Sequence, residues 1–218
     1  MWRLWIFLLL LLAACDPEPT VAFTEPLPVG SADLTQFPRR HRGVYALRSD
    51  TLQHVVVLRR AVVFRGWGNF GRKSRHTIDS LRHTTNDAGQ PPKLRLVDAQ
   101  PDSATVLWQV TDTVFQLTTP DSTRLRRKGG LYYLNRARPT GYWETKKLRL
   151  RDHQLQLTAF TTDSLRLAAL RQAGLLERVT DQPNRYLARL TLRNQARLLR
   201  DPTLWPAAND SVYERQCV

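Results

Sequence analysis

Residues 148–157 read LRLRDHQLQL, and this stretch decides the fold class. Its leucines alternate with arginine before Asp152-His153 and with glutamine after it. Alternation with a period of two places the leucines on one face of a β-strand and the polar residues on the opposite face. Two residues between such runs are the usual length of a tight hairpin turn. The stretch therefore predicts two antiparallel strands joined at Asp152-His153.

Similar short runs extend on both sides of this hairpin. Residues 105–110, for example, place Val106, Trp108 and Val110 on one face of a strand. Gly129-Gly130 marks a turn, because glycine adopts turn conformations at no steric cost. The further strands that we predict cover residues 43–47, 52–58, 61–64, 94–97, 105–110, 113–117 and 131–134.

The end of the chain predicts helices beside the sheet. Asp163 and Ser164 can cap a helix that runs to about Ala173, and Gly174 is placed to end it. Beyond it we expect a hairpin of residues 175–179 and 186–192, and then a helix over residues 192–200 that stops before Pro202. Short strands, short turns and few helices indicate an α+β fold: mostly antiparallel β sheet, curved or a partial barrel, with C-terminal helices.

The chain begins with an apolar run, residues 4–12, preceded by Arg3. Nine helical residues rise about 14 Å, less than half of a hydrocarbon core of about 30 Å. A charged start, a short apolar centre and small residues before a cleavage site are typical of a secretory signal. The stretch Leu12-Ala13-Ala14-Cys15 resembles the lipobox of bacterial lipoproteins at all four positions.

That resemblance implies a lipoprotein signal peptide over residues 1–14, cleaved before Cys15. Cys15 would then carry the lipid, and several acyl chains anchor a protein stably. We therefore predict export to a bacterial envelope membrane, inner or outer, with the membrane bound through lipidated Cys15. The alternative is an ordinary secretory signal that contains a cysteine.

Residues 16–38 contain five prolines and four acidic residues, with no lysine or arginine. Proline fixes φ and withholds a backbone donor, which favours extended, solvated chain. We predict that residues 15–38 form the lipid anchor and a tether reaching up to about 70 Å, at about 3.1 Å per residue. A single domain would then cover residues 39–218.

Residues 39–218 hold 32 basic and 15 acidic residues, a net charge of +17. Export argues against nucleic acid as a partner, so an anionic surface of the envelope or an envelope protein is expected. The densest basic cluster is the candidate contact for a polyanion and consists of Arg124, Arg126, Arg127 and Lys128. A solvated basic surface is the alternative, since 28 of the 33 basic residues are arginines scattered along the chain.

Two further patterns suggest chemistry but favour simpler interpretations. Residues 66–71 match G-x-G-x-x-G, yet Trp67 and Phe70 crowd any approach to a pyrophosphate, so we expect a glycine-aromatic loop and no cofactor. His76, Asp79 and His83 could share one side of a helix, but the two histidines lie two turns apart in a polar stretch. We predict neither a metal site nor catalytic residues.

The aromatic residues of the central strands are the candidate ligand or partner surface: Tyr132, Tyr133, Tyr142 and Trp143. Neighbouring residues of a strand face opposite sides, so we expect one tyrosine of the first pair in the core and the other exposed or lining a cavity. The run from Gly130 to Asn135, with Tyr142-Trp143-Glu144, is similar to a strand pattern of small lipoproteins from Bacteroidetes-type bacteria. That resemblance implies no activity.

These observations favour a non-enzymatic, membrane-tethered accessory or interaction protein. One alternative is a lipocalin-like carrier of a lipid or other apolar ligand, since Gly43-Val44-Tyr45 resembles the lipocalin G-x-W motif with tyrosine in place of tryptophan. An exported hydrolase is the other alternative. Cys217 is a lone thiol beside the C-terminus, free or joined to another chain.

Overall fold

A computed structural model describes residues 19–50, 52–84, 92–179, 185–188, 190–191 and 194–216, with the backbone alone for residues 207–211. The predicted signal peptide, Cys15 and Cys217 lie outside the described residues. The chain divides into two compact units. Unit 1 comprises Met1–Leu34, Thr118–Leu148 and Leu157–Ala208, and unit 2 comprises Thr35–Leu117, Arg149–Gln156 and Asn209–Val218.

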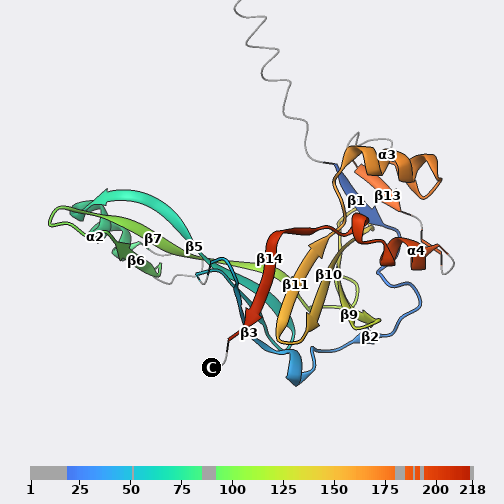
Figure 1. The fold of residues 1–218 in the computed structure, drawn as a ribbon, viewed down its shortest axis with the longest axis horizontal. Coiled ribbons are helices and arrows are strands. Elements are labelled where there is room, and N and C mark those ends of the chain that lie inside the picture. Colours follow the sequence, from blue (N-terminus) through green and yellow to red (C-terminus); the bar gives the residue numbers. More distant parts are fainter. Residues whose placement is uncertain are drawn as a thin grey trace, which may run out of the picture. The chain divides into compact units, whose positions relative to one another are not determined.

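Unit 1 is built on a sheet in which β1 joins distant parts of the chain (Figure 1). On one side β1 runs parallel to β13, and on the other it pairs antiparallel with β10. The remaining strand neighbours are antiparallel, in the orders β12-β13 and β10-β9-β8-β2. The strands are β1 (Thr20–Phe23), β2 (Asp33–Leu34), β8 (Thr123–Lys128), β9 (Leu131–Ala137), β10 (Trp143–Arg151), β11 (Gln154–Ala159), β12 (Leu176–Arg178) and β13 (Arg185–Ala188). The end of β10 and the start of β11, over residues 149–156, belong to unit 2.

C-terminal helices contribute to the core of unit 1: α3 (Ser164–Gln172), α4 (Gln195–Arg200) and the 3-10 turn η2 (Pro202–Leu204). Trp205, directly after η2, stacks on Phe23 of β1 at 6.3 Å between ring centroids. Phe160 meets both rings edge-on, at 5.6 Å from Phe23 and 5.1 Å from Trp205. These three rings join the first strand of the fold to its last helical turn. No described helix is both long and apolar enough to cross a bilayer.

The predicted tether is wrong for the described residues 19–38, because most of this segment packs into the fold. Phe23, Leu27 and Phe37 are buried, at 1%, 0% and 0% exposure. Proline cannot supply ladder donors, so side chains of unit 1 bind the backbone of the segment instead. Asn135 donates to Leu27 O at 2.7 Å and accepts from Leu27 N at 2.7 Å. The fold therefore begins before residue 39, the predicted start of the domain. Residues 39–218, predicted as one domain, belong to two units.

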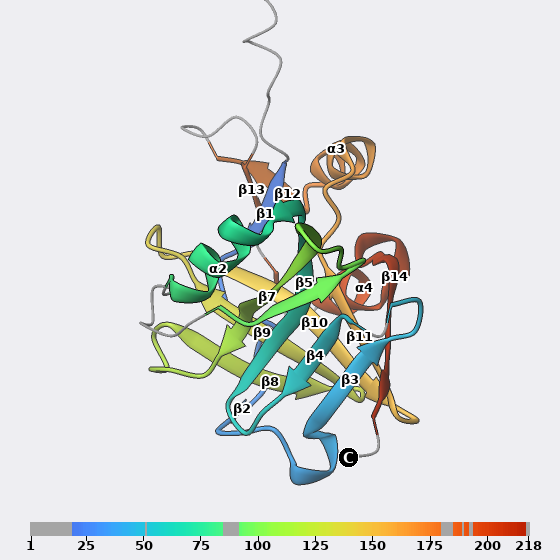
Figure 2. The ribbon, with the colours of Figure 1, turned by 90° about the vertical axis from the view of Figure 1, so that its left-hand side faces the viewer.

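Unit 2 is an antiparallel sheet with the order β14-β3-β4-β5-β7-β6. Figure 2 shows β3, β4 and β5 side by side. Its elements are η1 (Arg39–His41), β3 (Gly43–Leu47), β4 (His54–Val57), β5 (Ala61–Ser74), α2 (Arg75–His83), β6 (Leu94–Val97), β7 (Ser103–Gln116) and β14 (Ala207–Arg215).

The strands β5 and β7 are 14 residues long and continue beyond β4 as an arm that carries α2 and β6 (Figure 1). We call the part of unit 2 from residue 66 to residue 110 the arm. Its own buried cluster is small and consists of Ile78, Ala104 and Val106, with Leu94 packed against it. Several large apolar side chains of the arm consequently remain at its surface.

The predicted fold class is confirmed: the sheet is mostly antiparallel, is not closed, and is accompanied by C-terminal helices. The hairpin at Asp152-His153 is present, with φ of 52° and 64° at its two central residues. Positive φ at both positions defines the turn type whose twist suits a two-residue hairpin. The helix predicted after Asp163 is also confirmed as α3, and Asp163 accepts hydrogen bonds from Leu165 N and Arg166 N.

Candidate functional site

The four aromatic residues predicted as a surface do not form one. Tyr132 and Tyr133 are both buried, at 0% and 2% exposure, so neither is exposed, and neither lines the two pockets described below. Both faces of β9 are covered, because Tyr133 enters the main core and the Arg127 guanidinium lies 5.3 Å from the Tyr132 ring. Burial raises the pKa of Tyr133 to about 12. Tyr142 and Trp143 are half-buried.

The basic cluster of residues 124–128 is divided between surface and interior. Arg126 is buried, pairs with Asp33 at 2.6 Å, and donates to the carbonyls of Pro26 and Pro28. Arg124 also reaches Asp33, at 3.4 Å. Arg127 and Lys128 are exposed. Alternation along β8 places Arg124, Arg126 and Lys128 on one face and Arg127 on the other, and Arg126 is buried and not available to an external polyanion.

Residues 66–71 lie within β5, so the predicted glycine-aromatic loop is wrong. The glycines make room for aromatic rings rather than for a pyrophosphate. A Cβ atom on Gly66 would lie 2.9 Å from the Phe64 ring, and one on Gly68 would clash with the Trp108 indole. Gly68 pairs with Trp108 across the ladder, and Phe70 packs on that indole at 5.0 Å between centroids. The motif therefore serves ring packing on the arm.

His76, Asp79 and His83 all lie on α2, as the spacing allowed. Asp79 pairs with Arg82 at 3.4 Å. Among the described residues, no group of three or more His, Cys, Asp or Glu side chains is arranged to hold a metal ion.

A pocket of about 180 Å³ lies over β1, within unit 1. Residues of β1, β10, β13 and the β9–β10 turn line it, together with residues at and beyond the end of β11. Even-numbered residues of β1 face it, because Val21 and Phe23 face the core. The charged and polar lining residues are Thr20, Arg138, Thr140, Glu144, Thr145, Thr162 and Arg185.

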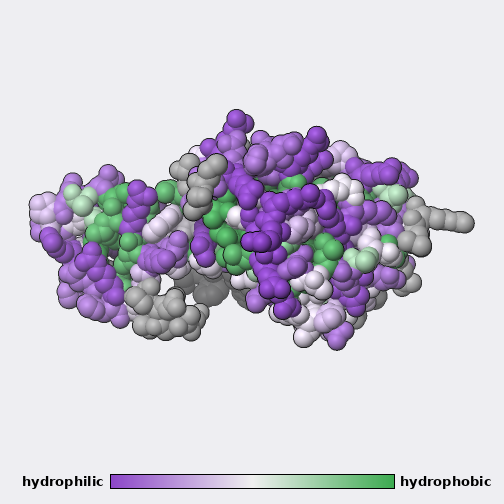
Figure 3. All heavy atoms as spheres, turned by 90° about the horizontal axis from the view of Figure 1, so that it is seen from below, coloured by the Kyte–Doolittle hydropathy of each residue, from purple (hydrophilic) through white to green (hydrophobic). Residues whose placement is uncertain are grey.

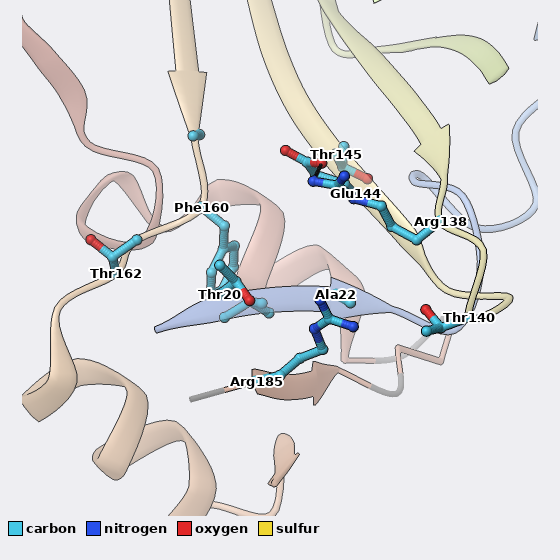
Figure 4. A pocket seen from close by; sticks show the side chains of 11 residues that line it. Thr20, Ala22, Arg138, Thr140, Glu144, Thr145, Phe160, Thr162 and Arg185 are labelled. Atoms are coloured by element: carbon cyan, nitrogen blue, oxygen red, sulfur yellow. Dashed lines mark ion pairs between the residues drawn. The ribbon is translucent and has the colours of Figure 1, made fainter. Parts of the chain in front are cut away.

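The charged side chains reach the pocket from the strands on either side of β1 (Figure 4). Arg138 and Glu144 come from the β9–β10 side and form an ion pair. Arg185 comes from β13, where it is directly opposite Thr20 in the register. Within the described part of the chain, Arg185 has no ion-pair partner. The formal charges of Arg138, Glu144 and Arg185 sum to +1, which favours an anionic ligand over a cationic one.

A second pocket, of about 250 Å³, lies on the arm and is lined by residues of α2 and of the β6–β7 connection. Its two arginines are already bound within the protein. Arg75 donates to Pro101 O at 3.2 Å, and Arg82 pairs with Asp79. The pocket over β1 is therefore the stronger candidate for a ligand.

Lys147 is an isolated cation in the interior of unit 1 and lines neither pocket. Its ammonium group donates to Leu199 O at 2.6 Å and lies 3.9 Å from the Trp205 ring centroid. Burial lowers the pKa of Lys147 to about 7, against the opposing attraction of Asp201. Its contacts are those of a structural group that ties β10 to α4.

The residues of the pocket over β1 were missed in the sequence because their partners are remote. Arg185 meets Thr20 only through a parallel pairing of strands 165 positions apart. The turn Pro139-Thr140-Gly141 does signal a hairpin, and it places Arg138 and Glu144 near each other.

No protein-family model, no curated protein and no solved structure matches this chain.

Proposed function

We propose that the protein is an exported lipoprotein, anchored through Cys15 in a bacterial envelope membrane, with a non-enzymatic binding role at the membrane surface. The lipobox Leu12-Ala13-Ala14-Cys15 supports the anchor, and the short distance along the chain from Cys15 to the fold carries the role at the membrane surface. β1 begins at Thr20, so only residues 16–19 separate the lipidated cysteine from the first strand. Four extended residues span at most about 14 Å.

This short connection would hold the fold much closer to the membrane than the long tether predicted from the sequence. The folded part is held beside the headgroups instead of tens of ångströms away from them. The high positive charge of residues 39–218 supports a role at an anionic surface, since basic residues near such a membrane each contribute about 1 kcal/mol.

The sizes of the pockets bear on the carrier alternative. A carrier needs an apolar cavity that encloses most of its ligand, and such sites usually measure about 300 to 1,000 Å³. The two pockets described above are smaller, at about 180 and 250 Å³, and charged side chains line both. They support binding of a small polar group more than transport of a whole lipid.

The anchor is tested by expressing the full chain in a bacterium that processes lipoproteins, with an alkyne fatty acid in the medium. We expect the label on the wild type and on Cys217→Ala, and its loss from Cys15→Ala. An inhibitor of the lipoprotein signal peptidase should make the uncleaved precursor accumulate. Labelled Cys15→Ala protein, or wild type without label in the soluble fraction, would overturn the proposal.

A further inference from the structure

We propose that the pocket over β1 binds a singly charged phosphodiester, the group at the centre of a phospholipid headgroup. The proposed function bears only on the source of this group, which is either the bilayer or a soluble glycerophosphodiester. The binding itself rests on the pocket alone.

Arg185 is the residue that we expect to bind the anion. Its backbone is held in β13 by pairing with β1, and its side chain is half-buried at the pocket. Figure 4 shows this side chain directed toward β1. No described side chain forms an ion pair with this half-buried guanidinium, so its charge is available to an anionic ligand. Planar donor pairs of this kind bind phosphate oxygens in a bidentate manner.

Charge favours a phosphodiester over a phosphomonoester. Arg138 is neutralised by Glu144, so Arg185 supplies a net charge of +1. A diester carries one negative charge, whereas a monoester carries about 1.5 to 2 at neutral pH. A second negative charge would meet the Glu144 carboxylate without compensation. The ion pair therefore makes the pocket selective for the singly charged group.

Hydroxyl groups and an apolar wall complete the site. Thr20, Thr140 and Thr162 are exposed on three different segments around the pocket, and each can donate a hydrogen bond to a phosphate or glycerol oxygen. Ala22, Ala159 and Phe160 supply the apolar part of the lining. A volume of about 180 Å³ accommodates a headgroup but not acyl chains, which would stay in the bilayer.

The position of the pocket on the chain agrees with a headgroup as the source. Thr20 lines the pocket and is five residues from Cys15. With the anchor inserted, those residues keep the β1 end of the pocket within about 20 Å of the lipidated sulfur. Lipid headgroups surround that sulfur, so their local concentration at the pocket would be high.

The site is tested on the chain that begins at Asp16, which retains all described residues and lacks the anchor. Titration calorimetry with glycerophosphoglycerol is the primary measurement, and inorganic phosphate is the comparison probe. We expect Arg185→Gln to weaken binding of the diester at least about tenfold. Arg136→Gln is the matched control, because Arg136 is an exposed arginine of unit 1 outside the pocket, and it should change affinity less than twofold.

A second variant moves the selectivity in the opposite direction. Glu144→Gln frees Arg138 and removes the carboxylate, so inorganic phosphate should bind about tenfold more tightly than to the wild type. Asp121→Asn changes the net charge equally at an exposed position outside the pocket and should have little effect. No binding of the diester by the wild type, or equal losses in Arg185→Gln and Arg136→Gln, would overturn the proposal.

Vesicle sedimentation then separates the two sources of the phosphodiester. Binding of the anchor-free chain to phosphatidylglycerol vesicles, reduced by Arg185→Gln but not by Arg136→Gln, assigns the lipid headgroup. Binding of soluble diester without such vesicle binding assigns a soluble source and keeps the site. Both results are independent of Cys15, so failure of the lipid anchor and failure of the pocket are observed separately.

Discussion

The interior of unit 1 holds buried polar side chains within its apolar core, whereas the surface of the arm holds exposed aromatic rings. Unit 1 buries Asn135, Lys147 and Gln195, at 0%, 6% and 1% exposure. The arm leaves Phe70 and Trp108 exposed, at 40% and 38%. Figure 3 shows apolar residues, in green, at the surface of the arm. In the first region the polar groups are bound to backbone, and in the second the apolar rings are bound to each other. Burial therefore follows from the partners that each side chain finds, more than from its polarity.

The segment of residues 24–34 explains why unit 1 needs its buried polar groups. This chain has few ladder bonds of its own, so buried side chains take their place. Asn135 and Arg126 bind the backbone of residues 26–28, and Gln195 both accepts from Val29 N at 2.9 Å and donates to Val29 O at 3.2 Å. In the arm β5 pairs with β7 along most of its length, and the side-chain bonds to backbone, such as that of Arg75 to Pro101 O at 3.2 Å, lie at the surface.

The largest expected effect is at Asn135. Asn135→Ala would leave Leu27 N and Leu27 O without partners and would remove the acceptor of the Thr145 hydroxyl. Each buried group left unpaired costs about 1 to 3 kcal/mol, so we expect the free energy of unfolding to fall by about 3 kcal/mol or more. Urea denaturation measures this loss, and hydrogen exchange should accelerate over residues 26–34. Gln172→Ala, an exposed amide of unit 1, should stay within about 0.5 kcal/mol of the wild type.

Lys147 makes the free energy of unfolding depend on pH. Its pKa of about 7 in the folded protein lies below the value of about 10.5 expected in the unfolded chain. Between these two values the unfolded chain binds more protons, so the free energy of unfolding rises with pH. The rise is at most about 1.4 kcal/mol per pH unit. We expect the wild type to gain stability relative to Lys147→Met from pH 7 to pH 10, and a flat difference across this range would contradict the burial of a titrating lysine. Lys146→Met, at the half-buried neighbouring position, is the matched control for the loss of a lysine from β10.

Local patterns predicted the parts of the fold whose partners are adjacent in sequence. The hairpin at Asp152-His153 and the capped helix after Asp163 are two such parts. The parallel pair of β1 and β13 could not be found in this way, because its strands are 165 positions apart and β1 lies in a proline-rich, acidic segment. Val21 and Phe23 do alternate there, but the composition around them outweighed a pattern of four residues.

The arm and the pocket escaped prediction for related reasons. The sequence at the end of β5 predicts a loop, because polar and apolar residues no longer alternate where little core lies beneath the strand, as at Gly68 and Arg72. Arg138 and Arg185 are indistinguishable in sequence from the other arginines of a chain that has 28 of them. Only the pairing of β1 with β10 and β13 brings these two arginines to the same pocket.

Gly68 tests whether the arm is held together by its rings. Gly68→Ala places a methyl group against the Trp108 indole, and such overpacking typically costs about 1 to 3 kcal/mol. In a Trp108→Ala background the same substitution should be neutral or stabilise the arm by about 0.5 kcal/mol, because alanine loses less conformational entropy than glycine. A double-mutant cycle by urea denaturation measures whether the effect of Gly68→Ala on the free energy of unfolding changes sign. Equal costs of Gly68→Ala in both backgrounds would show that the indole does not lie over the glycine.

The smallest effect is expected at Phe70, where the comparison is sharpest. Its ring pairs with Trp108 but remains 40% exposed, and an aromatic pair contributes about 0.5 to 1.5 kcal/mol. We expect Phe70→Ala to lower the free energy of unfolding by less than about 1 kcal/mol. A loss above about 2 kcal/mol would mean that this ring is part of a buried core, as in unit 1. A small loss instead separates the two regions: removing a polar group from the interior of unit 1 would then cost more than removing a whole aromatic ring from the arm.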